Sequence, residues 1–314
     1  MRDEPLSDSV ADADRKDRVA VNRGNATAEL LAHPAEAKAH ETPALISKPS
    51  TFAFGANWQR FLRHFTEDRV RNAEHSLLEF LGVDNLQGKS FLDIGCGSGI
   101  FSYAAYRLGA VRVVSFDADP LSAQCCSYLH DKAQRPANWE IHQNSVLNED
   151  FISSLGKFDV VYAWGTLQHT SRMWDAIQHS ANLVSKGGFF YIAIYNQVDG
   201  LLGSNFWRAF KRFFNSLPRA GQYLIELVAI PLYFLARRLH ARSLIADVQS
   251  YESSRGMYWR TDITDWLGGL PYECATVEEV FKFVRTQCRG FELYNLKTTN
   301  SLANNWYLFK RTAD

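Results

Sequence analysis

The sequence predicts an α/β protein with a seven-stranded, mostly parallel sheet, a helical cap inserted late in the chain and a C-terminal antiparallel hairpin. Three observations lead to this fold class. Short apolar runs alternate with helical segments between residues 89 and 196, which is typical of parallel βαβ units. A glycine-rich turn follows the first of these runs. The last two apolar runs lie too close together in sequence for a crossover connection.

The N-terminal part of the chain divides into a tail and a lid. Residues 1–50 contain no Phe, Tyr or Trp, although the whole chain has 42. A segment without aromatic anchors cannot offset its ordering entropy by burial, so we expect a disordered tail. Apolar residues then recur at helical spacing and predict one helix over 58–81. We assign residues 51–88 to an N-terminal helical lid.

Strands and helices alternate through the expected core, residues 89–196. Strands are predicted at 90–95, 111–117, 139–143, 158–164 and 187–196, with helices at 98–108, 120–132 and 173–184. Such alternation places helices on both faces of a parallel sheet.

The pattern changes after residue 196. We expect a helical cap at 197–275, on the substrate side, over the carboxyl ends of the strands, where open α/β folds bind ligands. A final helix (277–288) and two strands (291–298 and 304–311) then complete the core sheet within residues 276–314. The two strands are expected to pair as an antiparallel hairpin.

Composition excludes several classes of protein. Lys plus Arg and Asp plus Glu are 34 each, so the chain lacks the basic surplus of a general nucleic-acid binder, and we expect no nucleic-acid partner. Five cysteines, an odd number without a CxxC pair, favour a reducing cytoplasm, and the first residues lack the apolar run of a secretory signal. His, Asp and Glu show no ligand spacing, so we assign no metal.

One apolar run could touch a membrane. Residues 223–236 are 14 in number and include Glu226 and Pro231, whereas a spanning helix needs about 20 apolar residues. A buried or surface-lying helix is therefore favoured, with membrane contact as the alternative. Just upstream, residues 206–215 interleave cations with aromatics. This pattern favours an amphipathic helix whose aromatic side chains face inward and whose cations face water; contact with an anionic substrate, RNA or lipid headgroups is the alternative.

The most informative stretch is FLDIGCGSG at 91–99. Its glycines allow a tight turn in which a ligand can approach the next helix. Asp93 stands two residues before the first glycine, where it would repel a pyrophosphate and attract a cationic ammonium. Eighteen residues after Gly99, Asp117 ends the second strand, where a carboxylate can hold a ribose diol. Ribose together with ammonium indicates S-adenosyl-L-methionine.

These motifs resemble the class I S-adenosylmethionine-dependent methyltransferases over residues 52–314. FGANW, WGTLQHTSRMWDA and DWLGGLPYE are similar to a bacterial branch related to the ubiquinone-pathway methylases. The resemblance implies a Rossmann-like, cofactor-binding core. It also implies a set of cofactor residues: Asp93, Gly95, Cys96, Gly97 and Gly99 for the methionine part, Asp117 for the ribose, Ala118, Ser145 and Val146 for the adenine, and Trp164 near the sulfonium. The family usually has Asp where Ser145 stands.

The same resemblance places further residues beside the reacting methyl group. His169, in the loop after the fourth strand, is the candidate general base, because a hydroxyl acceptor must lose a proton; a hydrogen bond within the loop is the alternative. The candidate acceptor contacts are Trp58 in the lid, Tyr195 and Asn196 after the fifth strand, and Asp262, Asp265, Trp266 and Glu273 in the cap. Core packing and a structured turn are the competing explanations for Trp58 and for the cap residues.

The leading hypothesis is an enzyme that transfers a methyl group from S-adenosyl-L-methionine to an oxygen of a small hydroxylated metabolite or glycan precursor. A nitrogen acceptor stays open. The alternatives are a methyltransferase acting on RNA or protein, and a noncatalytic or peripheral membrane protein that binds the cofactor. The oligomeric state is not predicted.

Overall fold

The computed structural model describes the backbone of residues 52–240 and 259–313, with side chains described for 52–232 and 263–313. All of these residues belong to one compact unit, Ser47–Asp314. The tail expected at residues 1–50 lies outside the described residues.

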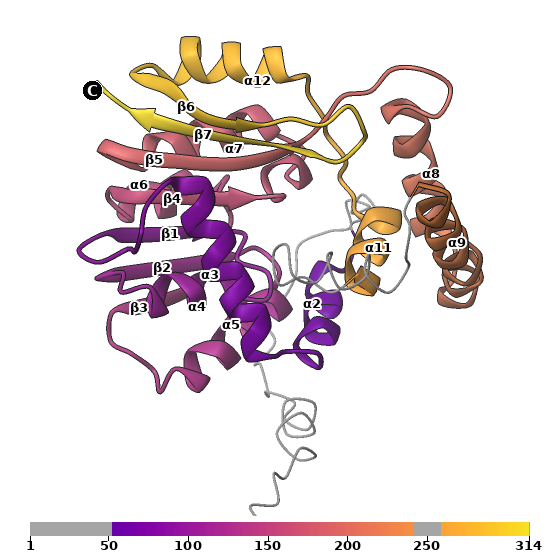
Figure 1. The fold of residues 1–314 in the computed structure, drawn as a ribbon, viewed down its shortest axis with the longest axis horizontal. Helices are drawn as coiled ribbons and strands as arrows, with labels where there is room; N and C mark the ends of the chain where they lie inside the picture. The colour runs from indigo at the N-terminus through magenta and orange to yellow at the C-terminus, as the bar shows by residue number, and fades with distance from the viewer. Residues whose placement is uncertain (1–51, 241–258, 314) are drawn as a thin grey trace, which may run out of the picture. The chain divides into compact units, whose positions relative to one another are not determined.

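A seven-stranded sheet forms the centre of the described chain, in the order β3-β2-β1-β4-β5-β7-β6 (Figure 1). β1 to β5 pair in parallel, whereas β7 is antiparallel to both β5 and β6, so the predicted fold class is confirmed. The strands are β1 Ser90–Ile94, β2 Arg112–Asp117, β3 Trp139–Gln143, β4 Phe158–Trp164, β5 Val184–Tyr195, β6 Phe291–Lys297 and β7 Asn304–Arg311.

Two hydrophobic cores cover the two faces of this sheet. Leu92 and Ile94 of β1 point into one core, which α6 (Glu149–Ser154), α7 (Met173–Asn182) and α12 (Val277–Phe283) complete. Phe91 points into the other, which α3 (Glu67–Leu81), α4 (Ile100–Arg107) and α5 (Pro120–Lys132) complete. Successive side chains of a strand alternate between faces, so Asp93 lies on the α4 side with Phe91.

The single helix predicted over 58–81 is wrong, because the chain breaks it into α2 (Phe54–Leu62) and α3. Thr66 caps α3: its hydroxyl accepts a hydrogen bond from Arg69 N at 3.3 Å, and two acidic residues follow in the first turn. The break lets α2 leave the sheet and reach α5, where Gly55 N donates to Asp119 Oδ2 at 2.8 Å.

Smaller differences have local causes. α6 was not predicted; the Asn148 side chain caps it by accepting from Phe151 N at 3.2 Å. α7 ends at Asn182 because Val184 already pairs with β4 as the first residue of β5. The final helix begins at a capping box between Thr276 and Glu279 and ends as a π-helical turn, η2 (Val284–Cys288).

The region expected as the cap contains three described helices, α8 (Ser204–Ser216), α9 (Arg219–His240) and α11 (Trp259–Gly268). They lie with α2 beyond the carboxyl ends of the parallel strands (Figure 1). Phe214, Ile263 and Leu267 form a small core between them, with Trp207, Phe210, Ile225, Ala229 and Ile230 packed around it.

A comparison of Gly99, in the turn after β1, with Gly88, before β1, tests how tightly this turn is packed. Gly88 and Gly99 both have positive φ, of 72° and 80°. A Cβ at Gly88 would meet no atom within 4 Å, whereas one at Gly99 would lie 2.7 Å from Cys126 Cα. We expect Gly88→Ala to cost about 1–2 kcal/mol of unfolding free energy, from backbone conformation alone. Gly99→Ala should cost roughly a further 1–3 kcal/mol from overpacking. Urea unfolding measures both; equal losses would contradict the close approach to α5.

Candidate active site

The turn between β1 and α4 is held in place by β2. Gly95, Gly97 and Gly99 all have positive φ, of 69°, 55° and 80°, which other residues rarely adopt. The backbone N–H groups of Gly95 and Cys96 both donate to the carbonyl of Phe116, at 2.8 and 3.1 Å. The turn therefore brings bare backbone to the carboxyl ends of β1 and β2, at the start of α4.

Asp117 lies directly beside this turn. Its Oδ2 accepts from Gly97 N at 3.0 Å, and its Oδ1 accepts from Asp119 N at 2.9 Å. Burial raises the pKa of Asp117 to about 6, although both of these hydrogen bonds favour the ionised form. A carboxylate has about four acceptor positions, so these two backbone donors leave room for a hydroxyl donor from a ligand. This arrangement fits the predicted contact with a ribose diol.

The sequence led us to expect Asp93 to point out of the turn towards a ligand. In the structure it points away from that side. It is 2% exposed, and its Oδ2 accepts from Ser102 Oγ at 2.5 Å. Ser115 Oγ donates to Ser102 at 2.7 Å, and Trp139 Nε1 donates to Ser115 at 2.8 Å. The expected direct contact between Asp93 and an ammonium group therefore does not hold, because Asp93 faces α4. Asp93 can act on a ligand through its charge, without contact.

Burial raises the pKa of Asp93 to about 7, the Ser102 hydrogen bond opposes this, and the negative charge of Asp117 adds to the increase. Two carboxyl groups with raised pKa values therefore stand at the ends of neighbouring strands. A cation bound at the turn would favour the ionised form of both.

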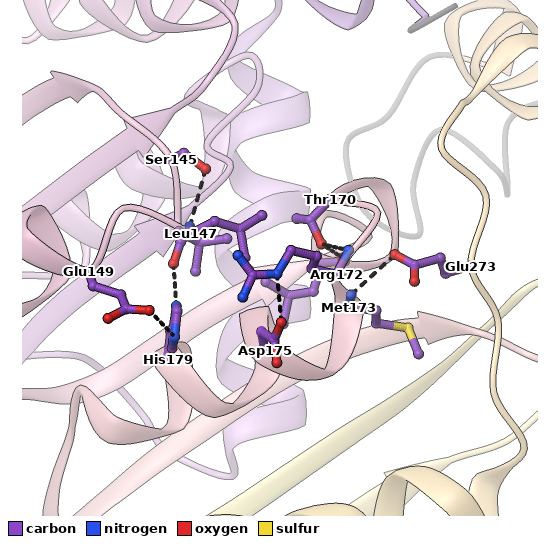
Figure 2. A network of polar contacts seen from close by, with 11 residues as sticks. Ser145, Leu147, Glu149, Thr170, Arg172, Met173, Asp175, His179 and Glu273 are labelled. Atoms are coloured by element: carbon purple, nitrogen blue, oxygen red, sulfur yellow. Dashed lines mark hydrogen bonds and ion pairs between the residues drawn. The ribbon is translucent and has the colours of Figure 1, made fainter. Parts of the chain in front are cut away.

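The loop after β3 is held by local hydrogen bonds. Ser145 Oγ accepts from Leu147 N at 3.1 Å, and His179 of α7 bonds the Val146 carbonyl through Nδ1 at 2.9 Å (Figure 2). The Val146 side chain is buried in the core, so its backbone alone is left to face an adenine. Ala118 is exposed at the end of β2. Ser145 and Ala118 stay predictions as adenine contacts.

The lid helix α2 packs on the glycine turn. A Cβ at position 97 would lie 2.8 Å from the Trp58 indole, so this ring covers the turn itself, rather than the acceptor side where we expected it. Asn57 Nδ2 donates to Asp265 Oδ1 at 2.6 Å, which joins α2 to α11 of the cap. Asp265, expected to bind the acceptor, is therefore engaged in holding lid and cap together.

His169 lies in the short helix η1 (Leu167–His169) that follows β4. Its Nδ1 is 2.5 Å from the carbonyl oxygen of Pro271, which can only accept, so we assign the proton to Nδ1 and leave Nε2 as an acceptor. The loop touches the glycine turn: Thr166 Oγ1 donates to the Gly95 carbonyl at 3.3 Å, and His169 N donates to the Thr166 carbonyl at 2.9 Å.

The surroundings of His169 keep it neutral. Burial lowers its pKa to about 4, the nearby positive charge of Lys211 acts in the same direction, and the hydrogen bond to Pro271 opposes them. The imidazole packs against Phe54, with ring centroids 4.8 Å apart, and against Tyr195 at 5.5 Å. At neutral pH the ring is therefore an uncharged proton acceptor among aromatic side chains.

Tyr195 connects His169 to the cap. Its ring lies 5.7 Å from that of Trp266 and 5.1 Å from that of Tyr272, between centroids. Trp164, at the end of β4, packs on Trp306 of β7 at 5.6 Å. The structure thus brings the rings of Tyr195, Trp266 and Tyr272 together beside His169.

Lys211 is a residue of this region that the sequence analysis missed. The expectation that the cations of residues 206–215 face water is wrong for Lys211, which is completely buried. Its Nζ donates to the Trp266 carbonyl and lies 4.7 Å and 5.0 Å from the ring centroids of Trp266 and Tyr272. Burial lowers its pKa to about 7, against the effect of Asp265. Its helical spacing from Trp207 and Phe214 was the signal for this orientation.

The structure gives two other candidates different partners. Asn196 Nδ2 donates to the carbonyls of Thr299 and Ser301, both at 3.0 Å, and so holds the β6–β7 hairpin loop. Glu273 Oε2 accepts from Met173 N at 3.1 Å and caps α7 (Figure 2). We therefore leave Asn196 and Glu273 out of the acceptor site. The side chain of Asp262 lies outside the described residues.

Among the residues described, no three or more His, Cys, Asp or Glu side chains are grouped so as to hold a metal ion. A hollow between α6 and α7 lies at the amino ends of β4 and β5, away from the glycine turn, and its lining includes Glu149, Lys157, Gln178 and His179.

Comparison with known proteins shows what this chain is similar to. A family model described as a methyltransferase domain matches residues 62–273, more than half of the chain. A ubiquinone biosynthesis O-methyltransferase from Methylobacterium sp. (strain 4-46) is 29% identical over 144 residues, 44% of this chain and 56% of the relative. A ribosomal protein L11 methyltransferase from Aeromonas salmonicida (strain A449) is 47% identical over 58 residues, 18% of this chain and 19% of the relative. The chain thus spans little more than half of the first relative and a fifth of the second.

Solved structures resemble the fold at low sequence identity. An O-methyltransferase family protein from Burkholderia thailandensis is 13% identical with a TM-score of 0.47, over 78% of this chain and 57% of that one. Magnesium protoporphyrin IX methyltransferase from Synechocystis PCC 6803, solved with bound S-adenosylmethionine, is 12% identical with a TM-score of 0.43, over 86% of both chains. From the family match, the strand order and the turn geometry, the chain belongs to the methyltransferase domain family, within the class I S-adenosylmethionine-dependent methyltransferases.

Proposed function

We propose that this chain transfers the methyl group of S-adenosyl-L-methionine to an oxygen of a small hydroxylated metabolite or glycan precursor. The observation that carries the choice of oxygen is the neutral His169 imidazole. It has its proton held on Nδ1 by Pro271, and its loop is bonded to the glycine turn through Thr166. A hydroxyl is protonated at neutral pH, so its methylation is assisted by a base that removes this proton.

The cofactor would be held by the turn and by Asp117. When bound, S-adenosyl-L-methionine supplies an electrophilic methyl group on a positively charged sulfur. Asp117 offers free acceptor positions to the ribose hydroxyls, while its hydrogen bonds to Gly97 N and Asp119 N fix the direction of the carboxylate. Asp93 adds negative charge from beneath the turn, where its contact with Ser102 keeps it in place.

His169 would take the acceptor's proton on Nε2. Proton uptake makes the imidazole positively charged, and the Pro271 carbonyl, which accepts from Nδ1, stabilises that charge. Tyr195, Trp266 and Tyr272 surround the site with aromatic rings, which exclude water while the acceptor oxygen and the methyl group are aligned.

A small acceptor fits this site better than RNA or a protein does. The bond between Asn57 and Asp265 joins the lid to the cap above the turn, so the acceptor side is covered by α2 and α11. Aromatic rings around a few convergent polar groups are typical of small-molecule sites. The neutral net charge of the chain supports the same choice.

Cofactor affinity should depend on pH through Asp117. Its pKa without ligand is about 6, and hydroxyl donors select the ionised form. Affinity for S-adenosyl-L-methionine should therefore be full above this pH and fall by up to about tenfold per pH unit below it. Asp117→Asn should bind about tenfold more weakly at pH 8 and lose this part of the pH dependence.

Isothermal titration calorimetry between pH 5 and pH 8 measures the effect. Asp93, whose pKa is about 7, ionises in the same pH range. Asp93→Asn is therefore the control that shows how much of the pH dependence of cofactor affinity comes from Asp93. Equal affinity for wild type and Asp117→Asn across the range would place the ribose elsewhere. Absence of any binding heat for the wild type would contradict the proposed function as a whole.

Replacing His169 should slow methyl transfer without changing cofactor affinity. We expect His169→Gln to lower turnover by roughly 10²- to 10⁴-fold, because it removes the proton acceptor. The measurement is transfer of labelled methyl to a panel of sugars and phenols, followed with the acceptor that the wild type methylates.

His130→Gln is the matched control for this variant. His130 also bonds a backbone carbonyl, through Nε2 at 3.3 Å from Pro136 O, but it lies in the last turn of α5, at the end remote from the glycine turn. Turnover of the control should match the wild type. If both variants keep wild-type turnover, His169 serves only to hold its loop.

A further inference from the structure

One face of α9 is apolar and uncovered among the described residues. Its inner face, with Ile225, Ala229 and Ile230, packs on the small core of the cap. The outer side chains follow helical spacing and are 50–63% exposed: Tyr223, Leu224, Leu227, Val228 and Leu232. We call these five residues the α9 face. A helix that is apolar on both sides is normally buried on both sides, so the α9 face indicates a contact that the described chain does not supply.

Large exposed apolar side chains continue into α8 and the turn before it. Leu201 and Leu202 are 92% and 65% exposed, and Phe206 and Phe213 are 41% and 55% exposed. Thirteen large apolar side chains are prominently exposed among the described residues, and nine of these fall between residues 201 and 232. Exposure of this kind is therefore concentrated in the cap and is not a general property of the surface.

Basic residues outnumber acidic ones around the α9 face. Residues 200–240 contain six Lys or Arg and a single acidic residue, Glu226, in a chain whose total charge is zero. Glu226 is only 7% exposed, on the inner side of α9. Lys211 is buried and Arg208 is half-buried, so the exposed charged residues between 200 and 232 are Arg212 and Arg219. An apolar helix face with cations beside it is complementary to a surface of acyl chains below negative headgroups.

A second copy of the chain fits this surface less well. A two-fold dimer places the same patch on both sides of the interface. Arg212 and Arg219 of one copy would then face an equally basic surface on the other, which opposes association. None of the helices in the described residues combines the length and apolar character that crossing a bilayer requires.

We propose that α8 and α9 dock this protein on the surface of an anionic lipid bilayer. α9 lies in the plane of the interface, with the α9 face among the first acyl carbons and Arg212 and Arg219 at the level of the lipid phosphates. The helix keeps its inner contacts with the cap in this position. Docking does not depend on the proposed methyl transfer, because none of these side chains belongs to the candidate active site.

Vesicle flotation with the full-length chain tests the proposal. We expect the protein to float with vesicles of phosphatidylcholine mixed with phosphatidylglycerol, and to float far less with phosphatidylcholine alone. Added salt should weaken the binding, because it screens the attraction between the arginines and the headgroups. Equal flotation with both kinds of vesicle would overturn the electrostatic part of the proposal, and no flotation with either would overturn it altogether.

Two variants locate the contact. Leu224→Asp with Leu227→Asp should lower the vesicle partition coefficient about tenfold or more, because charges enter the buried face. Val111→Asp is the matched control: Val111 is 56% exposed and lies outside the cap, so its replacement should leave partitioning unchanged. Circular dichroism and the affinity for S-adenosyl-L-methionine check that each variant is folded.

Arg212→Gln with Arg219→Gln should reduce binding to the anionic vesicles only. If the double aspartate variant still partitions like the wild type, the α9 face is not the contact. Sedimentation without lipid tests whether a second copy of the chain covers the α9 face instead. If the wild type is a dimer and the variant Leu224→Asp with Leu227→Asp is a monomer, the face belongs to a dimer interface, and docking on lipid is overturned.

Discussion

The turn after β1 is the constraint on which the rest of the site depends. Two of its three left-handed glycines are fixed from β2: Gly95 N donates to Phe116 O, and Gly97 N donates to the Asp117 carboxylate. Three separate parts of the chain then meet it: Trp58 of the lid at Gly97, Thr166 of the η1 loop at Gly95, and Cys126 of α5 at Gly99. A side chain at any of these positions would push one part away, so the turn sets the spacing of α2, the η1 loop and α5.

The same turn concentrates negative charge where the protein has little solvent to stabilise it. Burial raises the pKa of Asp93 to about 7 and that of Asp117 to about 6, so both carboxyl groups hold their protons more tightly than exposed carboxyls do. A cationic ligand reverses this effect by favouring the ionised forms. The charge of a bound ligand and the ionisation of these carboxyl groups are therefore expected to be coupled.

The cap buries a charged side chain and exposes several large apolar ones, which is the reverse of the usual distribution. Lys211 carries an ammonium group into the aromatic cluster of Trp266 and Tyr272, while Phe206, Phe213 and the α9 face hold apolar groups in water. Both cost free energy in the isolated chain unless something compensates. The aromatic rings and a backbone carbonyl compensate Lys211 from within, and a lipid surface would compensate the α9 face from outside.

Local sequence determined the elements and the turn of this protein. The predicted bounds of β3, β4, β7 and α5 agree with the structure to the residue, because apolar periodicity and turn residues act over a few positions. Tertiary contacts decided the rest. The direction of Asp93 depends on Ser102 across the α4 interface, the roles of Asn196 and Glu273 on partners about 100 residues away, and the burial of Lys211 on α11. Periodicity says which face a side chain occupies; the element packed against that face decides whether it meets ligand, solvent or protein.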